Sequence, residues 1–144
     1  MTLRAAGLCA CLLVAACGDS APKVEEITPS QPVNQVTILS AVPPGGTVLA
    51  PGSTVTLKYA FSYQLVTGDT GSIVMVLSDQ QSRTLNEPGN YTNAPITRGS
   101  GTAELSHVLA IPSTGVSSII VHFPMFVGTS TRSEPMAMVQ YPVR

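Results

Sequence analysis

The sequence predicts an all-β protein in which antiparallel strands form a single β-sandwich. The chain is rich in Val, Ser and Thr and holds 12 Gly and 12 Pro among its 144 residues, a mixture that favours strands and turns over helices. Apolar and polar residues alternate over a long central stretch, residues 53–65. After residue 20 no apolar pattern with helical spacing persists, so short strands separated by turns remain as the predicted architecture.

The central stretch gives the strongest prediction of a strand. Its six apolar residues stand at every second position, which places them on one buried face of a long strand. They are Val55, Leu57, Tyr59, Phe61, Tyr63 and Leu65. The Gly-rich segment 67–71 that follows has the composition of a hairpin turn. The next strand, 72–78, is apolar from Ile73 to Leu77, which predicts burial on both of its faces.

The other strands are shorter and are separated by Pro and Gly. Residues 87–101 are expected to form a loop with at most one short strand, because Pro and Gly interrupt them repeatedly. The remaining expected strands are 36–39, an edge segment at 47–49, a weaker strand at 82–85, and then 102–111, 116–127 and 136–143.

This order of about seven strands resembles the immunoglobulin-like and fibronectin type III-like modules of secreted bacterial proteins. The resemblance covers residues 35–143, and it implies one immunoglobulin-like β-sandwich domain at 35–144. The pattern departs from antibody domains because the chain has no Trp and no Cys after Cys17.

Residues 1–16 have the features of a bacterial signal peptide. Arg4 supplies a positive charge, and an apolar stretch follows that is too short to span a bilayer as a helix. Residues 13–17, Leu-Val-Ala-Ala-Cys, resemble the lipobox of bacterial lipoproteins. The resemblance implies cleavage before Cys17 and attachment of lipid to its sulfur, which makes the membrane a partner through the anchor. The alternative is an ordinary secretory signal that is cleaved elsewhere. Residues 17–34 are then expected to form the lipidated end and a flexible linker.

These features place the protein in the cell envelope. In lipoproteins of this kind, Asp directly after the lipidated Cys favours retention at the inner membrane. Here that position is Gly18, which favours the outer membrane. Because no Cys follows Cys17, a disulfide and a thiolate metal site are both excluded from the domain. The formal net charge of −1 offers no electrostatic surface for nucleic acid.

One motif suggests an enzyme. Residues 69–72, Asp-Thr-Gly-Ser, match the signature of aspartic peptidases, in which two carboxyl groups share one proton. With one copy per chain, Asp69 would have to act in a dimer, and Phe126-Val127-Gly128 would supply the later apolar motif. The segment is explained equally by turn chemistry, and no other catalytic motif is present. We therefore predict a protein that is not an enzyme and has no cofactor, with the dimeric peptidase as a remote alternative.

The last two strands suggest a metal site as a second alternative. If they form a hairpin around residues 128–132, Val121, Phe123 and Met125 face the core together with Ala137, Val139 and Tyr141. His122 then lies opposite Met138 on the other face, with Met136 two residues earlier. Imidazole and thioether groups are ligands that suit Cu(I). This predicts an extracytoplasmic copper-binding protein that uses His122, Met136 and Met138.

The preferred interpretation of the same face is a docking surface. Ile120, Phe126, Met136 and Met138 would form an exposed apolar patch, which on a soluble surface marks a site for a partner. The sequence therefore predicts a lipid-anchored binding or structural module of the cell envelope with a protein partner. The carboxylates Asp79, Glu104 and Glu134 are expected to be solvated strand or turn residues.

Overall fold

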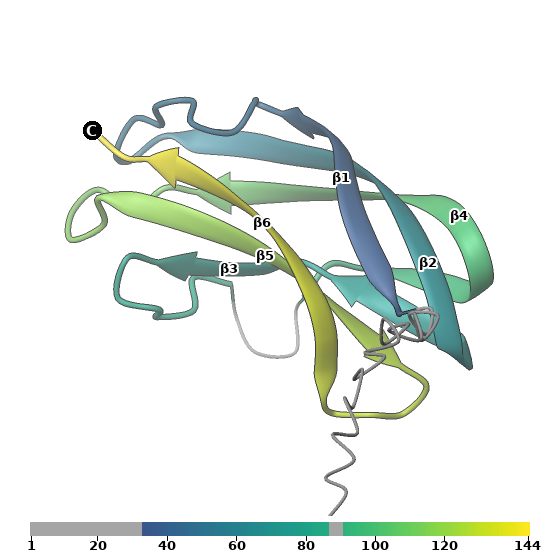
Figure 1. The fold of residues 1–144 in the computed structure, drawn as a ribbon. Coiled ribbons are helices and arrows are strands. Elements are labelled where there is room, and N and C mark those ends of the chain that lie inside the picture. Colours follow the sequence, from purple (N-terminus) through teal and green to yellow (C-terminus); the bar gives the residue numbers. More distant parts are fainter. Residues whose placement is uncertain (1–32, 87–90) are drawn as a thin grey trace, which may run out of the picture. The chain divides into compact units, whose positions relative to one another are not determined.

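The computed structural model describes residues 33–86 and 91–144 and confirms the all-β fold class. Six strands pair in antiparallel ladders, with none of the described residues in a helix (Figure 1). The described part of the chain accordingly contains no helix that could cross a membrane. The strands are β1 (Gln35–Val42), β2 (Thr54–Val74), β3 (Val76–Asp79), β4 (Asn93–Ala110), β5 (Ser118–Val127) and β6 (Ser133–Pro142).

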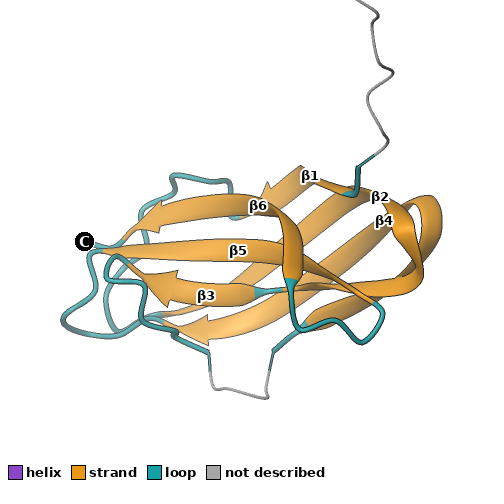
Figure 2. Cartoon of the chain, turned by 60° about the horizontal axis from the view of Figure 1, so that its bottom comes forward, coloured by secondary structure: helices purple, strands orange, loops and turns teal. Residues whose placement is uncertain are grey.

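Two long strands, β2 and β4, belong to both layers of the sandwich. For this reason the described residues form six strands, whereas about seven were expected. The first half of β2 pairs with β1 and with the second half of β4 to form a three-stranded layer. The second half of β2 pairs with the first half of β4 and with β5 in the other layer. That layer is completed by β3 and β6, which flank β5 (Figure 2).

The expected turn at 67–71 is wrong, because these residues continue β2 through a large bulge. The β2–β4 register shifts between Leu65, which is opposite Gly99, and Thr70, which is opposite Thr97. Residues 66–69 of β2 therefore oppose Arg98 alone. The side chain of Asn34, 3% exposed, satisfies the bulge: its Oδ1 accepts hydrogen bonds from the backbone N–H groups of Val66 and Thr67. Asn34, the last residue of the expected linker, is thus part of the folded domain.

The expected loop at 87–101 is also wrong over most of its described length. β4 begins at Asn93 and continues through Gly99 and Gly101, because β2 supplies a paired partner for nearly every one of these residues. Gly101 is needed here for space: the ring of Tyr63 lies across it, and a Cβ would approach the Tyr63 hydroxyl to 2.6 Å. Residues 87–90 lie outside the described part.

The break between β2 and β3 falls at Met75 and is stabilised by a buried asparagine. Asn86 accepts a hydrogen bond from the Leu77 N–H (3.1 Å) and donates one to the Met75 carbonyl (3.1 Å). Met75 and Leu77 are fully buried, whereas Val74 and Val76, which alternate with them along the chain, are half-buried. The expected burial on both faces is therefore wrong, since Val74 and Val76 point to the outer face of the layer.

The core lies between the two layers and is centred on three aromatic rings. The ring of Phe123 lies 4.7 Å from the rings of both Tyr59 and Phe61, centroid to centroid, so it joins β5 to β2. The Tyr59 hydroxyl donates to the Tyr141 hydroxyl (2.9 Å), which donates to the Pro43 carbonyl (2.8 Å). Desolvation by burial raises the pKa of both hydroxyls above the usual range. They consequently stay protonated and keep donating these bonds.

Candidate functional site

The outer side of the layer that holds β3 and β5 is the candidate functional site. The hairpin of β5 and β6 has the expected register: Val121 is opposite Val139, Phe123 is opposite Ala137, and His122 is opposite Met138. Because neighbouring residues of a strand point to opposite faces, Phe123 is fully buried and Met138 is 61% exposed. We define the β3–β5 face as the outward residues of this layer: Val74, Val76, Ser78, Ile120, His122, Pro124, Phe126 and Met138.

The predicted apolar patch is present in a less exposed form. Met138 is open to solvent, whereas Ile120 and Phe126 are half-buried. Pro124 between them is buried. Met136 is opposite Pro124 in the β5–β6 register, and its side chain lies outside the described residues. Among the described side chains, the result is a partly apolar surface from which Met138 projects.

Two neighbouring hollows are set into this face. The larger, about 570 Å³, is lined by Val74, Val76, Tyr91 and Phe126 and by small hydroxyl residues of the β5–β6 turn. The smaller, about 270 Å³, is lined by Val76, Ser78, His122 and Pro124. Val76 lines both, so the hollows adjoin. The described residues that line them include no Asp, Glu, Lys or Arg, and this surface therefore suits an uncharged ligand or partner with apolar groups.

His122 stands at the centre of the face and is oriented by β3. Its Nε2 lies 3.0 Å from the Ser78 hydroxyl in a hydrogen bond across the β3–β5 pair. His122 and Met138 are adjacent, as the copper alternative requires. Among residues 33–86 and 91–144 there is no group of three or more His, Cys, Asp or Glu side chains that could hold a metal ion. Copper binding by His122, Met136 and Met138 stays a prediction.

Asp69, the residue of the peptidase alternative, lies on the β2 bulge. Its side chain is 89% exposed and forms an ion pair with Arg98 (3.1 Å), whose Nε also donates to the Gly68 carbonyl. The geometry shows an open, solvated carboxylate beside an arginine. Nothing in this setting favours two carboxyl groups that share a proton, which requires a close, shielded pair.

Asp79 was expected to be solvated, and this expectation is wrong. Its side chain is 1% exposed at the end of β3, where the chain turns back. One carboxylate oxygen accepts hydrogen bonds from the backbone N–H groups of Gln81 (2.8 Å) and Arg83 (2.9 Å), and the other accepts from Arg83 Nε. Glu104, by contrast, is exposed as expected, and the side chain of Glu134 lies outside the described residues.

These contacts determine the ionisation of Asp79. Desolvation opposes the charged form, but the hydrogen bonds from Arg83 and Gln81, together with the charge of Arg83, outweigh it and hold the pKa of Asp79 below its usual value. Composition did not reveal this role, although an Asp side chain that accepts hydrogen bonds from nearby backbone N–H groups is typical of a tight turn. Asp79 therefore organises the turn beside the smaller hollow, which includes Ser82 and Thr84.

The Asp79→Asn variant should unfold more easily than the wild type near neutral pH, because the amide loses the charge that receives these bonds. A carboxyl with a lowered pKa stabilises the fold above its unfolded pKa of about 4, and this stabilisation is lost as the pH falls through the folded pKa. The difference between the two proteins should hence shrink below about pH 4. Thermal unfolding across pH measures it, with Asp69→Asn as the control, because that carboxylate is 89% exposed. A difference that is constant with pH would contradict the role of the charge.

Comparisons with known proteins add little to this geometry. No protein-family model matches the sequence, and no curated protein matches it. Among solved structures, the chain is similar to two crystal structures of a β-glucosidase from Listeria innocua, one of them in complex with isofagomine. Sequence identity is 13% in both, with TM-scores of 0.45 and 0.43. The alignments cover 77% of this chain and 16% of the β-glucosidase. Similarities at this level carry no argument about activity.

The predicted lipid attachment site, Cys17, lies outside the described residues, as do the signal peptide at 1–16 and nearly all of the linker. These predictions depend on the sequence motif alone.

Proposed function

We propose that this protein is a lipid-anchored binding module of the cell envelope, attached through Cys17 to the outer membrane, and that it contacts a protein partner through the β3–β5 face. The lipobox at residues 13–17 supports the anchor. The immunoglobulin-like arrangement is part of the same proposal. The observation that carries the binding role is the pair of adjoining hollows beside the exposed Met138, whose described lining residues carry no formal charge.

The chemistry of the face defines the partner. Apolar groups of Val74, Val76 and Phe126 line the larger hollow together with hydroxyl-bearing residues of the β5–β6 turn. A partner surface with apolar side chains and a few hydrogen-bonding groups would fill both hollows, because apolar burial supplies affinity and these hydroxyls supply orientation. Since none of the described lining residues is Asp, Glu, Lys or Arg, binding should respond weakly to salt.

A photoreactive amino acid in place of Met138 tests the proposal in intact cells. We expect one discrete adduct with another envelope protein, formed equally at low and high salt. The matched control carries the same photoreactive group in place of Leu39, which is 59% exposed on β1 in the other layer. It should give no such adduct.

A third arm combines the Met138 probe with Cys17→Ala. Loss of the lipid should move the protein into the soluble fraction and lower the yield of the adduct, since tethering raises the local concentration of the two partners. Adducts that are the same from both probe positions, no adduct from position 138, or capture of a second copy there would each contradict the proposal. An unchanged location of the Cys17→Ala variant would contradict the anchor.

A further inference from the structure

The outer edge of β4 is a long strand edge without a partner in the described part of the chain. β4 pairs with β2 over its whole length, and neither residues 33–86 nor residues 91–144 supply a second strand beside it. Along Gly99–Ala110 it forms the border of the three-stranded layer. Every second residue of such an edge presents its N–H and C=O groups outward, where another strand can pair with them.

The other strand edges are blunted or covered. In β1 the register shifts between Ile38 and Ser40, and Pro43 follows its end. The edge of β6 is covered by the segment after β1, through hydrogen bonds from Gly46 N–H to the Gln140 carbonyl (2.8 Å) and from Leu49 N–H to the Pro142 carbonyl (2.9 Å). β3 is backed by the chain that returns from its turn, where Leu85 N–H donates to the Leu77 carbonyl (2.8 Å).

Gly99–Ala110 has none of these protections. It contains no Pro, Lys or Arg and no shift in its register with β2. Its outward side chains on the solvent face are small or β-branched at most positions, and Val108 is 62% exposed. The first part of β4 differs, because Pro95 and Arg98 interrupt it. Proteins commonly place charges, prolines or bulges on exposed edges. Here Glu104 is the one residue with a formal charge, so this edge is the least protected against pairing with another strand.

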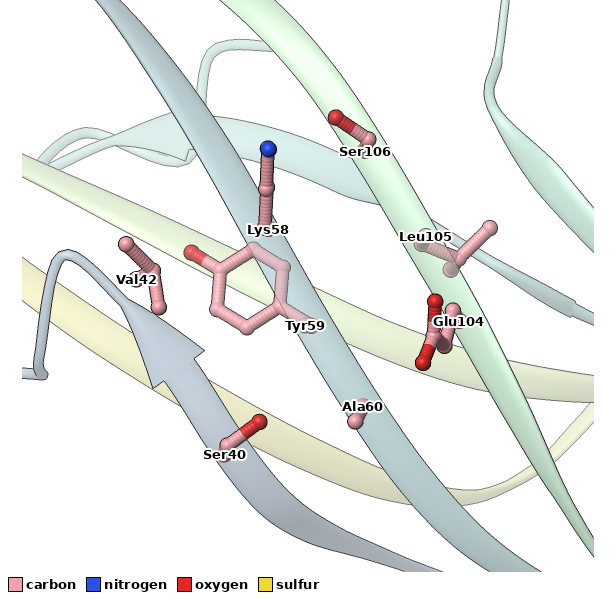
Figure 3. A pocket seen from close by; sticks show the side chains of 8 residues that line it. All are labelled: Ser40, Val42, Lys58, Tyr59, Ala60, Glu104, Leu105 and Ser106. Carbon is pink, nitrogen blue, oxygen red and sulfur yellow. The ribbon is translucent and has the colours of Figure 1, made fainter.

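Two side chains of opposite charge, Lys58 and Glu104, lie beside this edge and do not form an ion pair with each other. Lys58 and Glu104 both line a hollow of about 440 Å³ on the outer face of the three-stranded layer (Figure 3). The β2–β4 register places Ser106 opposite Lys58, and Glu104 opposite Ala60. The two ion pairs found among the described residues, Asp79–Arg83 and Asp69–Arg98, involve neither Lys58 nor Glu104.

We propose that a second copy of this chain pairs antiparallel with the β4 edge, with Leu105 of both copies at the two-fold axis. Glu104 of one copy then lies opposite Ser106 of the other, and the three-stranded layers join into a continuous six-stranded sheet. Directly opposite residues in an antiparallel pair point to the same face. Lys58 and Ser106 of one copy and Glu104 of the second copy therefore lie in one row on the outer face.

Charge complementarity selects this register and this occupant. Lys58 and Glu104 of the second copy stand two strands apart, about 10 Å between backbones, with only the small Ser106 between them. Their long side chains can meet above it, and the two-fold axis repeats the pair. A register with Glu104 opposite Glu104 would bring like charges together, which destabilises a strand pair.

Charge exchange tests both the dimer and its register. Sedimentation equilibrium of the full chain, in density-matched detergent and reductant, should show a reversible dimer. Lys58→Glu and Glu104→Lys should each weaken the dimer about tenfold, because each substitution replaces two attractions by two repulsions. The double variant Lys58→Glu/Glu104→Lys should restore most of the affinity. Arg98→Glu, which changes a charge in the first part of β4, should leave the affinity unchanged.

Circular dichroism of each variant shows whether the fold is retained. A wild-type chain that stays monomeric at the highest soluble concentration would overturn the proposal. So would a dimer that is indifferent to both single reversals, or one that the double exchange does not restore, because the interface would then lie elsewhere or in another register.

Discussion

Phe123→Ala should lower the free energy of unfolding by about 3–5 kcal/mol, the largest single-residue effect we expect in this domain. Phe123 is fully buried, and its ring lies against both Tyr59 and Phe61. Removing it leaves a cavity at the point where β5 meets β2 across the sandwich, and the paired strands limit how far their backbones can move to fill it. The free energy of unfolding of small domains is about 5–15 kcal/mol, so the variant should keep only a small part of its stability.

Urea unfolding measured by circular dichroism gives the comparison, with Leu39→Ala as control. Leu39 is an exposed aliphatic residue of β1, and its truncation should change the free energy of unfolding by less than about 0.5 kcal/mol. A small loss for Phe123→Ala, similar to that of the control, would mean that the two layers are not held together by this aromatic cluster.

The sequence predicted this core because side-chain alternation is a local property. The apolar residues of 53–65 alternate without interruption, and Leu57, Tyr59 and Phe61 are buried as that pattern requires. The same reasoning gave the β5–β6 register, because two alternating strands around a short turn have few ways to bury both apolar faces. The candidate site followed from it: once Phe123 faces inward, His122 faces outward beside Met138.

What sequence reasoning missed depends on contacts between distant segments. Asp79 is buried by its own turn and accepts hydrogen bonds from backbone donors that composition does not reveal. The side chains of Asn34 and Asn86 take the place of missing strand partners. Asn34 accepts a hydrogen bond from a residue 32 positions later in the sequence, and Asn86 accepts one from a residue 9 positions earlier. The hollows also needed the fold, since Tyr91 and Phe126 come together only when β5 lies beside the second half of β2.

The glycines of residues 67–71 were also misjudged, because their role depends on contacts with a distant strand. Their substitution gives the second large effect that we expect on the free energy of unfolding. Gly-rich composition predicted a turn, whereas neither Gly68 nor Gly71 is among the glycines with positive φ. Both are required because β5 approaches the β2 bulge closely. A Cβ at Gly71 would lie 2.6 Å from the backbone carbonyl oxygen of Phe126, and a Cβ at Gly68 would collide with Cγ1 of Val127.

Gly71→Ala should therefore destabilise the domain by about 1–3 kcal/mol, since the strand backbones must separate to admit the methyl group. Gly68→Ala should cost a similar amount, but its obstacle is a side chain. In the double variant Gly68→Ala/Val127→Ala the colliding Cγ1 is gone, and the remaining Cβ of Val127 lies 3.9 Å away, an ordinary contact. This variant should recover part of the stability, whereas Gly71→Ala/Phe126→Ala should recover none, because the obstacle at position 71 is backbone.

Urea unfolding of the four variants and of the two single truncations completes a pair of double-mutant cycles. Favourable coupling between positions 68 and 127, with none between 71 and 126, would establish that close packing of β5 on the bulge requires these glycines. Equal losses without coupling in either cycle would support turn conformation as the reason. The outcome also bears on Asp69, which lies between the two glycines: a bulge held against β5 keeps this carboxylate on the surface beside Arg98.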